Sequence, residues 1–147
     1  MNTVKPGILL IIGTNSESIM NIVMVDSANL SGDTDFPDLN LPKYGWMQFL
    51  SLDEAELAER CWRADVIIST RTPIRAELIE GAFKLKLIIA AGEDVGHIDQ
   101  GAAQTRGITL CNVPGLTGDN PQNTRQICCE VVNIINAWLE EKPINLI

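Results

Sequence analysis

Arg71 is the fixed positive charge in the part of this sequence where a ligand would be expected to bind. Four short segments, residues 26–28, 70–72, 91–94 and 113–115, each follow an apolar run. If these runs are parallel strands, the segments meet at the carboxyl edge of the sheet, where open α/β sheets bind their ligands. A guanidinium there would neutralise either an anionic ligand or the carboxylates of Glu93 and Asp94. The sequence leaves both alternatives open.

Other chemistry has less support from the residue types. Asp26, Glu93 and Asp94 carry oxygen atoms that could hold a magnesium ion, but this is a less favoured alternative to having no metal site. His97 is the single histidine, so a zinc site with two imidazoles and a nucleophile activated by a nearby base are both unsupported. The four cysteines form no C-x-x-C pair, and we expect reduced thiols.

The sequence also lacks the motifs that bind nucleotides. G-x-G-x-x-G requires two glycines separated by one residue, and no two of the 11 glycines have this spacing. We therefore expect that this chain alone binds no cofactor.

Length and charge narrow the class of protein further. A chain of 147 residues is long enough for one domain with one core. A formal net charge of -8, without a cluster of Lys and Arg, makes nucleic acid an unfavourable partner. The apolar runs are far shorter than the ~20 residues that cross a bilayer, and the first residues lack a complete signal-peptide pattern. We expect a cytoplasmic protein without a membrane span.

Short apolar runs alternate with amphipathic stretches, which is typical of a parallel sheet covered by helices. This alternation predicts an α/β fold, with a doubly wound sheet of about five parallel strands and helices on both faces. The predicted strands are residues 22–25, 46–50, 66–69, 85–91 and 108–112.

Three shorter helices and one long helix are expected between and after these strands. Ser51 and Glu54 have the spacing of a capping box that opens a helix over residues 52–62, and Thr72 with Pro73 predicts the start of the second. The third covers residues 97–106, and Asn120 with Pro121 opens the long C-terminal helix to residue 141.

The long helix carries an apolar arc wider than one sheet requires. Part of this arc either meets a second surface or is covered by loops of the same chain. The candidate interface residues on it are Ile127, Val131, Ile134, Ile135 and Trp138.

The chain divides into two parts. Residues 20–147 form the predicted single domain, with residues 33–43 as a loop in place of a first helix. Residues 1–19 are an N-terminal extension, in which residues 8–12 have the pattern of an extra or exchanged strand, or a remnant foreign to the domain.

A set of short stretches occurs in the order and spacing of a known family. They are ADVII (64–68) with TPI (72–74), LKLI (85–88) with AAG (90–92), VGHID (95–99), RGI (106–108) and CNVPG (111–115). As a set, they resemble the N-terminal substrate-binding domain of the D-isomer-specific 2-hydroxyacid dehydrogenases, the group of glycerate and phosphoglycerate dehydrogenases. The resemblance implies a flavodoxin-like sheet and, in the family, a separate Rossmann domain that binds NAD and carries the catalytic residues.

The resemblance also implies a substrate element in this domain. In the family, backbone N–H groups of a glycine-containing loop hold the substrate carboxylate, and this loop corresponds to Ala91, Gly92, Glu93 and Asp94. Glu93 and Asp94 replace small or neutral residues, and each would repel a carboxylate at ~4 Å by about 1 kcal/mol in water. The candidate substrate-binding residues are therefore these four and Arg71.

Three functions fit these expectations. The first is a stand-alone, catalytically incomplete relative that binds a small carboxylic acid or a protein, as a homodimer through the C-terminal helix. The second is a substrate-binding subunit that completes an NAD-dependent dehydrogenase with a separate Rossmann-domain partner. The third is a remnant without selected activity.

Overall fold

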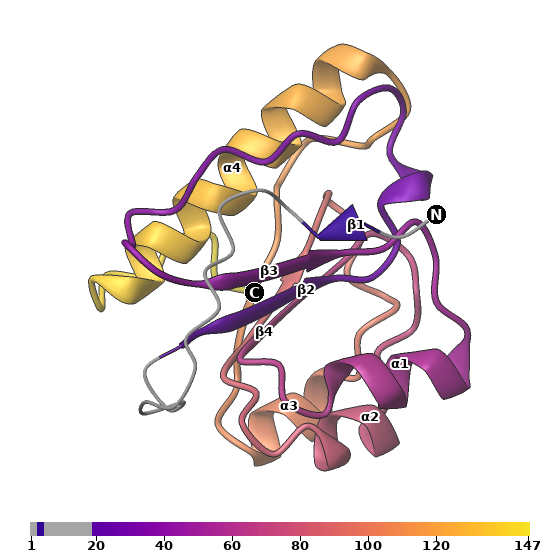
Figure 1. The fold of residues 1–147 in the computed structure, drawn as a ribbon, viewed down its shortest axis with the longest axis vertical. Helices are drawn as coiled ribbons and strands as arrows, with labels where there is room; N and C mark the ends of the chain where they lie inside the picture. Colours follow the sequence, from indigo (N-terminus) through magenta and orange to yellow (C-terminus); the bar gives the residue numbers. More distant parts are fainter. Residues whose placement is uncertain (1–2, 5–18) are drawn as a thin grey trace.

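A computed structural model describes residues 3–4 and 19–147 of the chain, and its centre is a six-stranded sheet (Figure 1). The strand order is β1-β3-β2-β4-β5-β6, in which β2 to β6 are parallel and β1 is antiparallel to β3. The strands are β1 (Thr3–Val4), β2 (Asn21–Met24), β3 (Gly45–Gln48), β4 (Val66–Ser69), β5 (Leu87–Ala90) and β6 (Thr109–Cys111). The predicted five parallel strands are confirmed, with ends that differ by at most two residues.

Helices cover both faces of the sheet, as the sequence predicts. The helices are α1 (Glu54–Cys61), α2 (Ala76–Gly81), α3 (Gln100–Thr105) and α4 (Pro121–Leu139), with a short 3-10 turn, η2 (Ser27–Asn29). In Figure 1, α1, α2 and α3 lie on one side of the sheet and α4 lies on the other. Every side chain of β4 and β5 is buried, because both faces of these central strands are covered.

Neighbouring strand residues pack into two separate cores because side chains alternate between the faces of a strand. Ile22 and Met24 of β2 pack in the core beneath α4, whereas Val23 packs in the core beneath α1, α2 and α3. The segment of residues 30–44 runs beside α4 in Figure 1 and contributes apolar side chains to the α4 core. The loop predicted at residues 33–43 and α4 therefore cover the same face of the sheet together.

The capping box of α1 differs from the predicted one. Asp53, not Ser51, is the N-cap, and its carboxylate accepts a hydrogen bond from the Glu56 amide at 2.8 Å, while Glu56 accepts one from the Asp53 amide at 3.0 Å. This start places Leu52 before the cap and Leu57 in the next turn, and both are buried in the same core. The packing of this apolar pair explains why the later of two equally spaced boxes is used.

Two other helix starts are also later than predicted, whereas the start of α4 is confirmed. The Asp99 carboxylate caps α3, which begins at Gln100. Thr72 does not cap α2; the backbone of Ile74 instead bridges to the turn at residues 97–99 before α2 begins at Ala76. Asn120 caps α4 by accepting from the Asn123 amide at 2.8 Å, and Pro121 occupies the first turn.

Both edges of the parallel sheet are paired with another segment of the chain. β1 pairs with β3 at one edge, and residues 145–147 lie antiparallel to β6 at the other, with the Ile147 amide donating to the Leu110 carbonyl at 3.0 Å. Pairing of this kind removes exposed strand edges that would otherwise template association. The strand predicted at residues 8–12 lies outside the described residues.

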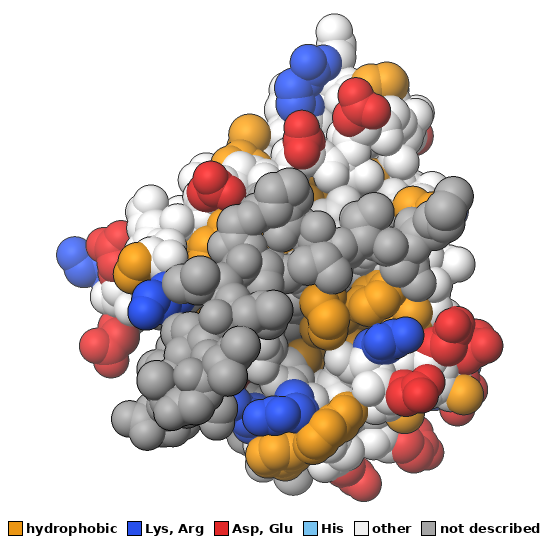
Figure 2. All heavy atoms as spheres, viewed as in Figure 1, with side chains coloured by type: hydrophobic (Ala, Val, Ile, Leu, Met, Phe, Trp, Pro, Cys, Tyr) orange, Lys and Arg blue, Asp and Glu red, His pale blue; other side chains and the backbone are white. Residues whose placement is uncertain are grey.

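The surface in Figure 2 carries charges of both signs. Lys and Arg side chains occur there in small separate groups among acidic and hydrophobic side chains. Within the described ranges, no helix has both the length and the apolar character needed to cross a membrane.

The cysteines differ enough in burial for a thiol titration to test the packing. All four are reduced thiols; burial raises the pKa of Cys61 to about 12 and that of Cys111 to about 11, whereas Cys129 is exposed. Because the thiolate is the reactive form, we expect Ellman's reagent to label one thiol rapidly in the folded protein and four in guanidinium chloride. Cys129→Ser should abolish the rapid phase; a rapid phase that persists would contradict this packing.

Candidate functional site

The five candidate substrate-binding residues line one crevice at the carboxyl edge of the sheet. Its volume is about 130 Å³, and its lining is Asn29, Leu30, Thr70, Arg71, Ala91, Gly92, Glu93, Asp94, Leu116, Thr117 and Gly118. The loops after β4 and β5 thus meet, as expected for neighbouring parallel strands.

Asp26, at the end of β2, organises the loop that carries Arg71. Its carboxylate is 1% exposed and accepts hydrogen bonds from the backbone amides of Thr70, Arg71 and Thr72 at 2.9, 3.0 and 2.9 Å. The hydroxyls of Thr70 and Thr72 donate to it at 2.8 and 2.7 Å, and the Asn29 side chain donates at 3.1 Å. The backbone amides of this loop therefore already have an acceptor within the protein, the Asp26 carboxylate.

The hydrogen bonds decide the charge state of Asp26. Burial on its own raises the pKa of this carboxyl, but the donors from Thr70, Arg71 and Thr72 outweigh burial and hold the pKa below the ordinary value of 3.8. The carboxylate is consequently ionised at neutral pH, and the loop after β4 is fixed by charge-assisted hydrogen bonds. A ligand in the crevice would meet side chains of this loop rather than its amides.

The Arg71 side chain is exposed at this crevice. Its backbone amide is bound to Asp26, but its guanidinium forms no ion pair with any residue that the structure describes. Of the two alternatives left open by the sequence, an ion pair with Glu93 or Asp94 is thus not the one observed in the described part of the chain. The guanidinium is available to a ligand.

Gly92 shapes the opposite wall of the crevice. Its φ of 155° is one that residues with a side chain rarely adopt, and a Cβ atom there would lie 3.3 Å from the Leu116 carbonyl oxygen. The Glu93 amide donates to that same carbonyl at 2.8 Å. Neither the Gly92 amide nor the Asp94 amide has an acceptor among the described residues, and both residues line the crevice.

Glu93 and Asp94 lie at the exposed rim of the crevice. Asp94 accepts a hydrogen bond from the Gly96 amide at 3.0 Å. The magnesium site considered for Asp26, Glu93 and Asp94 is not formed: the described residues contain no group of three potential metal ligands, and N–H and O–H donors occupy the Asp26 oxygens.

His97 contacts the end of β4, next to the loop that carries Arg71. Its Nε2 lies 3.2 Å from the Ser69 carbonyl oxygen, which can only accept, so Nε2 carries the proton. Its Nδ1 is buried and has no hydrogen-bond partner in the structure. Because Nε2 is committed to Ser69 and His97 does not line the crevice, this imidazole is not placed to exchange a proton with a ligand there.

The candidate interface on α4 requires a correction. Ile127, Val131, Ile134 and Ile135 are fully buried in the core that α4 forms with the sheet and residues 30–44, and Trp138 is partly buried against it. The four aliphatic residues are not accessible to a partner, so their assignment to an interface is wrong. The wide apolar arc is covered by the sheet and by a loop of the same chain, which was the other alternative. A homodimer stays a prediction without this surface.

Two parts of the site were not predicted from the sequence. The loop of residues 116–118 and Asn29 line the crevice, although the sequence points only to strand ends. The signal that could have located the loop is Gly115, whose φ of 77° reverses the chain toward the crevice after β6.

A comparison with protein families matches residues 27–121, more than half of the chain, to the D-isomer specific 2-hydroxyacid dehydrogenase catalytic domain. A putative 2-hydroxyacid dehydrogenase of Haemophilus influenzae is 23% identical over 124 residues, which are 84% of this chain but 39% of that protein. A D-3-phosphoglycerate dehydrogenase of Archaeoglobus fulgidus is 42% identical over 50 residues, 34% of this chain and 10% of that protein. This chain thus spans well under half the length of these relatives.

Solved structures show the same fold. The NAD+-bound 3-phosphoglycerate dehydrogenase of Entamoeba histolytica matches with a TM-score of 0.50 and 23% identity over 65% of this chain and 33% of that chain. The apo D-lactate dehydrogenase of Escherichia coli matches with a TM-score of 0.50 and 13% identity over 67% of this chain and 32% of that chain. The fold is therefore that of one α/β domain in proteins about twice as long as this chain.

Proposed function

Since the chain belongs to the D-isomer specific 2-hydroxyacid dehydrogenase family, we propose that its crevice binds a small carboxylic acid of the 2-hydroxy or 2-oxo class. We further propose that the chain contributes by binding and does not transfer hydride by itself. The observation that carries the proposal is that residues lining the crevice have donors without an acceptor among the described residues, namely the exposed Arg71 guanidinium and the amides of Gly92 and Asp94.

These donors suit a carboxylate. A guanidinium forms paired, charge-assisted hydrogen bonds with carboxylate oxygens, and a backbone amide adds a third donor of fixed direction. The crevice of about 130 Å³ favours an acid with few carbon atoms. The acidic rim at Glu93 and Asp94 weakens the attraction, so we expect low affinity.

The residues present do not fit NAD, the cofactor implied by the family. The sequence has no G-x-G-x-x-G, and the crevice lies below the roughly 300 Å³ at which pockets for drug-sized ligands begin. The only histidine of the sequence is bound to the Ser69 carbonyl. These features support binding without hydride transfer, and no reaction step is assigned to this chain.

Ligand-observed NMR at low ionic strength, with a panel of 2-oxo and 2-hydroxy acids, tests the proposal. We expect saturable binding that Arg71→Gln weakens by roughly twofold to fivefold, the usual effect of one exposed charge pair. The double substitution of Glu93→Thr and Asp94→Gly should strengthen binding, by up to about fivefold for each repulsion of ~1 kcal/mol that it removes.

Two results would contradict this function. No binding of any acid by either the original chain or the double variant would exclude the crevice as a carboxylate site. Steady oxidation of NADH by the purified chain with a 2-oxo acid would exclude the second part of the proposal. Lys84→Gln removes a positive charge that does not line the crevice and serves as the control for Arg71→Gln.

A second candidate is a substrate-binding part of a dehydrogenase whose Rossmann domain is supplied separately. It is favoured by the exposed apolar side chains of Ile144, Leu146 and Ile147 in the segment that pairs with β6, and by the greater length of the relatives. This candidate requires NADH oxidation that appears only when a Rossmann-domain partner is added.

A further inference from the structure

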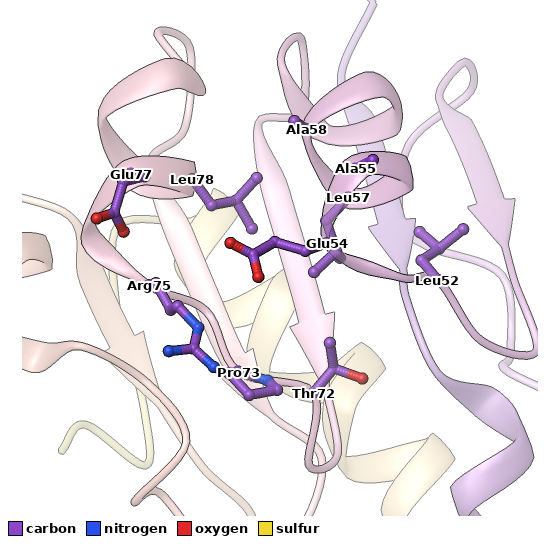
Figure 3. A pocket seen from close by; sticks show the side chains of 10 residues that line it. All are labelled: Leu52, Glu54, Ala55, Leu57, Ala58, Thr72, Pro73, Arg75, Glu77 and Leu78. Carbon is purple, nitrogen blue, oxygen red and sulfur yellow. The ribbon is translucent and has the colours of Figure 1, made fainter.

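A groove separates α1 from α2 on the face of the sheet opposite α4 (Figure 3). Its volume is about 560 Å³, within the roughly 300–1,000 Å³ of small-molecule sites. The lining residues come from α1, α2 and the ends of the loops that lead into them: Leu52, Glu54, Ala55, Leu57, Ala58, Thr72, Pro73, Arg75, Glu77 and Leu78.

The walls of the groove are mainly apolar. Leu52 and Leu57 are buried at its base, and Leu78 is partly buried on the α2 side. Thr72 adds little polarity because its hydroxyl donates to Asp26 at 2.7 Å. A bound molecule would therefore place an apolar group between the two helices, where it would be removed from water.

Three charged side chains line this groove, those of Glu54, Arg75 and Glu77, and the Glu77 carboxylate lies on the side of α2 away from α1 in Figure 3. Figure 3 shows the Glu54 carboxylate pointing into the space between the helices and the Arg75 side chain beside Pro73. Neither residue forms an ion pair with another residue of the described ranges, and the capping box of α1 uses Asp53 and Glu56 instead of Glu54. Glu54 is thus available to a cationic group and Arg75 to an anionic one.

We propose that this groove binds a free α-amino acid with a large apolar side chain. The ammonium group faces Glu54, the carboxylate faces Arg75, and the side chain packs against Leu57 and Leu78. A single small molecule that carries both charges beside an apolar group matches this lining better than a ligand with one charge. The groove and the crevice share no lining residue, so the inference goes beyond the proposed function and does not depend on it.

The charges make the proposal testable with matched ligands. We expect L-phenylalanine or L-leucine to bind in ligand-observed NMR, and glycine, which lacks the apolar group, to bind much less. N-acetyl-phenylalanine has no ammonium group and phenylalaninamide has no carboxylate. Each should bind roughly twofold to fivefold more weakly than phenylalanine, the range for one exposed charge pair.

Two variants assign these losses to residues. Glu54→Gln should weaken the binding of phenylalanine to the level of N-acetyl-phenylalanine, while phenylalanine still binds more tightly than phenylalaninamide. Arg75→Gln should weaken the binding of phenylalanine to the level of phenylalaninamide, while phenylalanine still binds more tightly than N-acetyl-phenylalanine. Glu59→Gln on the same helix and Lys84→Gln after α2 do not change the lining of the groove and should leave all affinities unchanged.

The crevice variant Arg71→Gln separates this proposal from the proposed function, because it should leave phenylalanine binding unchanged. A loss of phenylalanine binding in Arg71→Gln, with no effect of Glu54→Gln or Arg75→Gln, would place the ligand in the crevice and overturn the proposal. Equal binding of phenylalanine and both blocked compounds would also overturn it. Binding of a terminally blocked amphipathic peptide, without binding of free amino acids, would make the groove a protein-docking site instead.

Discussion

Asp26→Asn is expected to lower the free energy of unfolding by about 3 kcal/mol, measured by urea denaturation at pH 7. The Asp26 carboxylate is buried and accepts from three backbone amides and two hydroxyls of the loop after β4. An asparagine keeps one oxygen but turns an NH2 group toward these donors, so several buried donors lose their acceptor. Each loss of this kind costs about 1–3 kcal/mol, and relaxation of the loop recovers part of it.

The pH dependence gives this prediction a second readout. The folded-state pKa of Asp26 lies below its ordinary value of 3.8, so its contribution to stability is fully present above pH ~4 and is lost as the pH falls through the folded-state pKa. The difference in unfolding free energy between the original chain and Asp26→Asn should therefore be constant near neutrality and shrink below about pH 4. A difference that grows with acidity would contradict the assigned charge state.

Asp65→Asn is the matched control. Asp65 is also buried, but among the described residues its carboxylate accepts one hydrogen bond, from the Asn21 amide at 2.8 Å, which an asparagine oxygen can accept equally. We expect a cost of about 1 kcal/mol or less. Equal costs for the two substitutions would show that loss of a buried carboxylate, and not the network at the loop after β4, determines the effect.

The same loop is where prediction from the sequence reached its limit. Arg71 and residues 91–94 could be assigned to one crevice because parallel strands bring their carboxyl ends together. The sequence offers Asp26 as a metal ligand, but its carboxylate oxygens accept hydrogen bonds from backbone amides. Backbone amides carry no sequence signature, so a carboxylate that binds them cannot be told from one that binds a ligand.

The strands and the start of α4 were predictable because their signals are local. β5 is a run of consecutive apolar residues, and Asn120 with Pro121 forms a cap and first turn. The start of α1 was not predictable from local signals, since Ser51 and Asp53 each have a glutamate three residues later. Burial of Leu52 and Leu57 decides between the two boxes, and burial depends on tertiary packing.

For α4, the sequence likewise does not show what covers the apolar surface of the helix. The wide apolar arc was predicted correctly, but its width alone does not distinguish a second molecule from a second part of the same chain. Phe36 and Leu39 of the segment beside α4 supply the additional cover, and the Asn136 side chain accepts a hydrogen bond from the Asn40 amide at 2.9 Å. A segment without a regular pattern gives no sequence signal that it packs against a helix.

Ile134→Ala should therefore lower the free energy of unfolding by about 3 kcal/mol at every protein concentration. Ile134 is fully buried in the core of α4, and removal of its outer carbons leaves a cavity that the surrounding side chains fill only in part. Substitutions of this kind cost about 2–5 kcal/mol. Urea denaturation of the original chain and the variant, repeated over a hundredfold range of concentration, measures the effect.

The concentration series separates the two assignments of this helix. If Ile134 packs within one chain, the difference between the two midpoints does not change with concentration, because the substitution then alters no contact between copies. If it lies between two copies, both midpoints rise with concentration and the variant is a weaker dimer. Asn133→Ala, at the exposed neighbouring position, should change stability by less than about 0.5 kcal/mol and controls for effects on the helix itself. A midpoint that rises with concentration in the original chain and not in Ile134→Ala would restore the interface and contradict the core described for α4.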